Sequence, residues 1–160
     1  MQLEEYALRL GMLVGNFQSL EFLLRACLYE QSDPPHSPLT ADNLLQTLSV
    51  GDEVEVNAVT DYSSLGDLVD RYNALMRVFR PELVVDRSLT DIRDALAHGR
   101  ISTIDPARDL HLLKFDRPAA SKTTVSFSQA LTSDWFERQT SRVVNEMKKV
   151  ALAHGRAEFP

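Results

Sequence analysis

Residues 3–28, LEEYALRLGMLVGNFQSLEFLLRACL, decide the fold. Apolar residues recur in this stretch at alternating spacings of three and four, which places them along one face of a helix. At 1.5 Å per residue the helix would run roughly 40 Å, more than a compact helix needs, so we expect part of it to pack against a partner chain. The apolar stripe consists of Leu3, Tyr6, Leu10, Leu13, Phe17, Leu20 and Leu24.

Two glycines, Gly11 and Gly15, lie four residues apart in this stretch and therefore share a helix face. One interpretation is that they let another backbone approach closely. The other is that the helix merely tolerates them. The sequence leaves both interpretations open.

A proline-rich segment follows the first helix. Three prolines between residues 32 and 38 break the hydrogen bonding of a helix and impose an extended loop, in which His36 is a solvated residue. Thr40 can then cap a short helix. Residues 53–56 alternate charge and valine, which allows a brief strand without demanding one. The short helix carries Leu44, Leu45 and Leu48.

Two more helices are predicted between residues 65 and 99. Apolar residues repeat at helical spacing over residues 65–79, and Pro81 ends that second major helix at about residue 80. A third helix is expected to begin near Ser88, whose hydroxyl together with Asp91 three residues later resembles a capping pair. Gly99 is the natural end of this third helix.

The period changes between residues 110 and 128. Residues 123–128 alternate polar and apolar side chains, and residues 110–115 form a matching apolar run. We expect a β-hairpin that turns at residues 118–121, the alternative being an extended loop over the helices.

Thr132 or Ser133 can cap a last helix with an apolar stripe through Phe136, Val143, Met147 and Val150. The expected fold is therefore mainly α, a bundle of about four main helices with a β-hairpin inserted before the last one. A length of 160 residues predicts a single domain over residues 1–160.

Composition limits the classes of function. A net charge of −6 argues against an open, nonspecific nucleic-acid surface but leaves room for a local basic pocket. No apolar run is long enough to span a bilayer, and the acidic first residues differ from an export signal. We therefore expect a cytoplasmic protein without a membrane partner. The single cysteine, Cys27, falls on the apolar side of the first helix and predicts an inert packed thiol.

Most familiar catalytic motifs are missing from the sequence. It contains no phosphate-binding loop, no Gly-x-Gly-x-x-Gly, no Cys-x-x-Cys and no His-Glu-x-x-His. We therefore expect neither a metal site nor a cofactor. His111 and His154 have no evident nucleophile or ligand beside them.

The hexapeptide Ala-Leu-Ala-His-Gly-Arg occurs twice, at residues 95–100 and 151–156. The plain explanation is that both copies end helices, since a histidine in the last turn faces the negative end of the helix dipole and a glycine follows it. Only the first copy has an arginine five residues before its histidine and an aspartate beside that arginine: Arg93, Asp94 and His98.

This segment, Asp91-Ile-Arg-Asp-Ala-Leu-Ala-His-Gly99, resembles the Arg-x4-6-His motif of the HEPN superfamily. Residues 17–25 look like the opening helix of that family. The resemblance covers most of the chain as architecture and about nine residues as motif. One toxin branch of the family has a tyrosine two residues after the histidine, where this chain has Arg100, so the resemblance does not extend to that branch.

The resemblance implies a metal-independent endoribonuclease, as in a toxin–antitoxin or defence system. His98 would act as acid or base, Arg93 would hold the phosphate, and Arg100 is a possible second contact to an RNA phosphate. Asp94, four residues before His98, shares its helix face and would orient the imidazole. Arg93 lies about 140° around the helix from His98 and needs its long side chain to converge with it.

The expected partners are RNA, a second copy of the chain, and an antitoxin or other protein. A homodimer is expected because one histidine cannot readily serve as both base and acid in one turnover. The alternative is a noncatalytic HEPN-like module that binds a protein or nucleic acid, with Arg93 and His98 as a relic of the fold.

Overall fold

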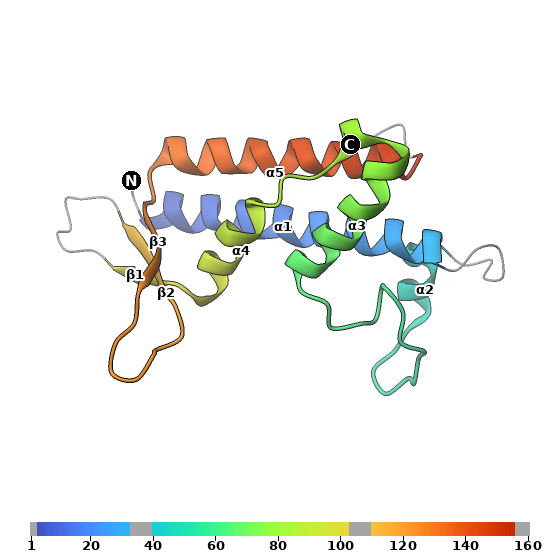
Figure 1. Ribbon diagram of the computed structural model, residues 1–160, viewed down its shortest axis with the longest axis horizontal. Coiled ribbons are helices and arrows are strands. Elements are labelled where there is room, and N and C mark those ends of the chain that lie inside the picture. Colours follow the sequence, from blue (N-terminus) through green and yellow to red (C-terminus); the bar gives the residue numbers. More distant parts are fainter. Residues whose placement is uncertain (1–2, 33–39, 103–109, 156–160) are drawn as a thin grey trace. The chain divides into compact units, whose positions relative to one another are not determined.

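Helices dominate the computed structural model, which describes residues 3–32, 40–102 and 110–155. The predicted loop over residues 32–38, with His36, lies outside the described residues from position 33 onward. A mainly helical fold with a β-hairpin before the last helix is confirmed (Figure 1). Along the chain the elements are α1 (Leu3–Ser32), α2 (Ala41–Thr47), α3 (Leu65–Phe79), the 3-10 turn η1 (Pro81–Leu83), α4 (Leu89–His98), β1 (Arg100–Ser102), β2 (His111–Phe115), β3 (Val125–Ala130) and α5 (Ser133–Ala153).

The chain forms two compact units. Unit 1 comprises residues 1–17 and 88–143, and unit 2 comprises residues 18–87 and 144–160. Within unit 1 the start of α1 lies beside the first half of α5 (Figure 1). The two helices are in contact there, because the ring of Tyr6 meets that of Phe136 edge-on with centroids 5.9 Å apart. Beside this contact, Arg9 Nη1 donates to Glu137 Oε1 at 3.1 Å. By the bounds of the two units, α1 and α5 each contribute residues to both.

The apolar stripe of α1 is buried over most of its length, although Leu3 is 74% exposed. Because the stripe supplies core residues to both units, the length of α1 does not by itself require a partner chain. A Cβ added to Gly11 or Gly15 would meet no atom within 4 Å. No described segment of the chain therefore makes the close approach that these glycines would permit.

Helix ends follow the predicted capping chemistry in most places. Thr40 accepts the backbone N–H of Asn43 at 3.3 Å, and Thr132 accepts that of Trp135 at 3.1 Å. Of the two candidate caps of α5, Thr132 is thus the one used. The brief strand allowed over residues 53–56 does not form.

A three-stranded antiparallel sheet precedes α5, in the order β1-β2-β3. The predicted hairpin corresponds to β2 and β3, which join across a turn with a bridge between Ala119 and Lys122. The first strand was not predicted, because its three residues are all exposed and show no alternation. It forms by pairing with β2, Arg100 lying opposite Leu113. The sheet packs on α4 through β2, whose Leu112 is 1% exposed.

Buried and partly buried polar contacts help to hold the core of unit 2 together. Asn73 on α3 donates to Val85 O and accepts from Val85 N, both at 2.8 Å. Arg25 on α1 donates to Asp61 Oδ1 at 2.8 Å and to Ser63 O at 2.8 Å. Cys27 is buried, and burial raises the pKa of its thiol to about 11, as expected of a packed cysteine. No described helix combines the length and apolarity needed to cross a membrane.

Candidate active site at the end of α4

The motif residues lie on the last two turns of α4 in unit 1. This helix buries Leu89, Thr90, Ile92 and Ala95, and its opposite side carries the charged residues. The predicted capping pair of Ser88 and Asp91 is wrong. Ser88 has helical backbone angles and its hydroxyl makes no cap. Instead Ser88 Oγ accepts a hydrogen bond from Arg142 Nη2 of α5 at 2.8 Å. The hydroxyl therefore makes a tertiary contact in place of the helix cap.

Gly99 ends α4, and its N–H donates to Ala95 O at 2.7 Å. Its backbone angles, φ −74° and ψ 171°, are open to any residue, so conformational freedom does not explain the glycine. A Cβ at this position would lie 2.3 Å from Ala95 O and 2.5 Å from Leu112 Cδ1. Gly99 therefore allows β2 to pack against the end of the motif helix.

The two copies of the hexapeptide differ in structure. In the second copy, the His154 side chain is only 6% exposed and its Nε2 lies 3.0 Å from Glu30 Oε2. Gly155 has φ +73°, the left-handed conformation of a helix end. In the first copy the His98 side chain is 66% exposed. The second copy is thus a helix end with a buried histidine, whereas the first presents its imidazole to solvent.

Three polar side chains, His98, Asp94 and Lys114, connect the motif to the sheet. His98 Nε2 lies 3.5 Å from Asp94 Oδ1, one helical turn earlier. The other oxygen of this carboxylate, Oδ2, accepts a hydrogen bond from Lys114 Nζ of β2, and this bond raises the pKa of Lys114. Asp94 can therefore orient the imidazole while Lys114 holds Asp94. The sequence interpretation missed Lys114, whose only signal was its position as the charged member of an apolar run.

The two candidate arginines lie apart from this chain of contacts. Arg93 is half-buried and makes no hydrogen bond or ion pair with any other described residue. By helix geometry it projects about 140° away from His98. Arg100 is exposed at the start of β1, where its guanidinium carbon lies 5.3 Å from the ring centroid of Phe115, a cation–π contact.

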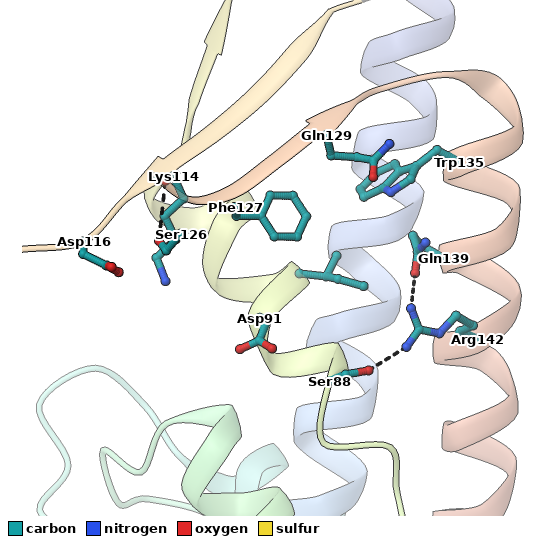
Figure 2. A pocket seen from close by; sticks show the side chains of 11 residues that line it. Ser88, Asp91, Lys114, Asp116, Ser126, Phe127, Gln129, Trp135, Gln139 and Arg142 are labelled. Carbon is teal, nitrogen blue, oxygen red and sulfur yellow. Dashed lines mark hydrogen bonds between the residues drawn. The ribbon is translucent and has the colours of Figure 1, made fainter. Parts of the chain in front are cut away.

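A cavity of about 550 Å³ lies in unit 1 between α4, the hairpin and α5 (Figure 2). Its lining includes Asp91 and Lys114 but neither Arg93 nor His98. Lys114 thus belongs both to the cavity wall and to the contacts that lead to His98. The sequence interpretation did not identify this cavity, because its lining comes from four separate segments.

No group of three histidine, cysteine, aspartate or glutamate side chains is arranged to hold a metal within residues 3–32, 40–102 and 110–155. Comparison of the chain with protein-family models, curated protein sequences and solved structures gives no match.

Proposed function

We propose that the chain is a metal-independent endoribonuclease of HEPN type, a toxin or defence component that works as a homodimer. The observation that carries the proposal is the exposed imidazole of His98 with its Nε2 3.5 Å from the Asp94 carboxylate. An exposed histidine with an orienting carboxylate can exchange protons with a bound substrate near neutral pH. The buried His154 of the second hexapeptide lacks that access.

The reaction uses the 2′-hydroxyl of the RNA as its nucleophile. A base removes the hydroxyl proton, the 2′-oxygen bonds to phosphorus, and the bond from phosphorus to the 5′-oxygen breaks. An acid then protonates the departing 5′-oxygen, leaving a 2′,3′-cyclic phosphate and a 5′-hydroxyl. His98 supplies the proton transfers, and Asp94 positions the His98 imidazole. Arg93 neutralises the phosphoryl oxygens, and its guanidinium is available because it makes no hydrogen bond or ion pair with another described residue. Arg100 is a second candidate for contact with RNA phosphates.

A second copy of the chain supports this chemistry, because two His98 residues across a shared cleft could act as base and acid. A different face of α1 in unit 1, which is apolar and exposed, offers a surface for such pairing; we call it the exposed stripe. Leu8 is 65% and Met12 is 54% exposed, and the open positions Gly11 and Gly15 lie on the same helix face. An antitoxin or another protein is the alternative occupant of this stripe.

The test is cleavage of mixed RNA by the purified chain in the presence of EDTA. We expect activity with EDTA, products that end in a 2′,3′-cyclic phosphate, and a loss of roughly 100-fold or more in His98→Ala. His111→Ala is the matched control, since His111 contacts Ser128 Oγ at 2.9 Å in the sheet and should keep wild-type activity. Activity abolished by EDTA and restored by Mg²⁺, or equal activity in the two variants, would refute the proposal.

A noncatalytic binding module is the second candidate. Two observations favour it: Arg93 and His98 project from different sides of α4, and the cavity of unit 1 includes neither of them. Under this alternative, RNA or a protein would bind without being cleaved, and His98→Ala would leave that binding unchanged.

A further inference from the structure

The cavity in unit 1 contains hydrogen-bond donors that have no acceptor among the described residues. Gln139 on α5 is 8% exposed, and its side-chain oxygen accepts from Arg142 Nη1 at 2.7 Å. Its amide nitrogen has no described partner. Trp135, one turn earlier, is 3% exposed, and its indole N–H has no described partner either. Both side chains line the cavity (Figure 2). Each side chain is largely enclosed, and its free donor is available to a ligand in the cavity.

An aromatic face and an acceptor complete the cavity. The ring of Phe127 from β3 projects into it from the side opposite Gln139 (Figure 2). At the rim, the Asp91 carboxylate accepts no hydrogen bond from another described residue. A volume of about 550 Å³ is within the range of pockets that enclose small organic ligands. The cavity therefore combines a stacking surface, two interior donors and an acceptor.

This combination matches the chemistry of a nucleobase. A base has a flat π-face, ring nitrogens or carbonyls that accept hydrogen bonds, and often an amino group that donates one. We propose that the cavity holds one unpaired base of an RNA chain, an inference that rests on the proposed ribonuclease function. Phe127 stacks on the base, while Gln139 and Trp135 donate to its acceptor atoms. The base must be unpaired, because a paired base has its Watson–Crick edge occupied.

The cavity is linked to the motif by Lys114. This residue lines the cavity and also donates to Asp94, which lies 3.5 Å from His98 Nε2. A base held in the cavity would therefore place neighbouring backbone of the same RNA strand near the end of α4. By binding an unpaired base, the cavity would make the site selective for single-stranded RNA, because Arg93, Asp94 and His98 themselves contact no base.

The binding test uses the fluorescence of Trp135, because the chain contains one tryptophan. A cleavage-deficient His98→Ala protein is titrated with a mixed-sequence single-stranded RNA of about ten nucleotides, the corresponding duplex RNA, and ribonucleoside monophosphates, all in EDTA. We expect a saturable change in emission with the single strand, at least about fivefold weaker binding of the duplex, and weaker binding of the monophosphates.

Two variants in the same background test the lining. Phe127→Leu and Gln139→Leu should each weaken binding of the single strand by about fivefold or more, through loss of stacking and of a hydrogen bond respectively. Gln18→Leu, at an exposed position of α1, is the control and should bind like its parent. Circular dichroism checks the folding of each variant, and Phe127→Leu tests the proposal if Gln139→Leu is unfolded.

Several results would overturn the inference. The first is the absence of a saturable response to single-stranded RNA, and the second is equal affinity in the parent and in folded Phe127→Leu. The third is monophosphate binding as tight as that of the single strand, which would assign the cavity to a free nucleotide. Cleavage by the wild type without a Trp135 response would refute the cavity proposal alone. A Trp135 response without cleavage by the wild type would refute the nuclease proposal alone.

Discussion

Glycine is required at position 99 because two packed segments leave no room for a side chain. Substitution to alanine would place a Cβ 2.3 Å from Ala95 O and 2.5 Å from Leu112 Cδ1, one of them a backbone atom. The same substitution at Gly11 meets open space. The cost of a glycine replacement in this chain therefore depends on tertiary packing and not on the residue type.

We predict that Gly99→Ala lowers the free energy of unfolding by about 1–3 kcal/mol, the usual cost of overpacking. Gly11→Ala should instead raise it by up to about 1 kcal/mol, since alanine is the better helix former. Urea unfolding of the two variants beside the wild type measures both effects. Equal effects at the two positions would contradict the packing argument.

At the scale of elements, ion pairs of Asp61, in the segment before α3, connect that segment to α1 and to α3. Asp61 Oδ1 accepts from Arg25 Nη1 at 2.8 Å and Oδ2 accepts from Arg71 Nη1 at 3.0 Å. Partial burial raises the pKa of the Asp61 carboxyl, but the hydrogen bonds from Ser63, Arg25 and Arg71 outweigh that effect and hold it well below its usual range. The ionised form of Asp61 therefore stabilises unit 2.

This shift predicts a loss of stability in acid. The stabilisation is complete above the pKa of an unfolded aspartate, about 3.9, and is lost as the pH falls from there through the lower pKa of the folded state. Urea midpoints should thus fall below about pH 4 in the wild type and less steeply in Asp61→Asn. Asp70→Asn is the control: Asp70 pairs with Arg87 at 2.9 Å on the surface, with both side chains more than half exposed, and its replacement should change little. An identical pH profile in wild type and Asp61→Asn would exclude this role.

At the scale of the whole molecule, the proposed nuclease needs a second copy of the chain. The exposed stripe on α1 is the candidate contact. We predict that the double variant Leu8→Glu with Met12→Glu sediments as a monomer and loses most RNA cleavage, because charges would be buried in a dimer contact. Val78→Glu, at a 73% exposed position of α3, is the matched control and should remain dimeric and active. A wild type that is monomeric at micromolar concentration would defeat the dimer.

A mixing experiment tests the composite site separately. Arg93→Ala and His98→Ala chains, combined and allowed to exchange, should not regain wild-type cleavage, because every heterodimer still lacks one Arg93 and one His98. Full recovery on mixing would show that one intact arginine and one intact histidine are sufficient.

The residues of the candidate site were predictable in part. Arg93, Asp94 and His98 were selected by their place at the end of a predicted helix and by the resemblance to the HEPN motif. The contact of Asp94 with His98 follows from their separation of four on a helix. Lys114 was missed because it is 20 residues from Asp94 in the chain, and only the packing of β2 on α4 brings the two together. The cavity escaped prediction for the same reason.

The sequence by itself determined the helices, most of their ends and the hairpin. These features depend on periods, caps and turns that act between residues a few positions apart. Only the tertiary structure decided the rest: that β1 pairs with β2, that Ser88 contacts Arg142 in place of capping α4, and that one hexapeptide buries its histidine while its twin exposes it. The shared sequence Ala-Leu-Ala-His-Gly ends a helix in both places, although Gly99 is extended and Gly155 is left-handed. The chemistry of the two helix ends differs because Glu30 lies beside His154, whereas His98 faces solvent next to Asp94.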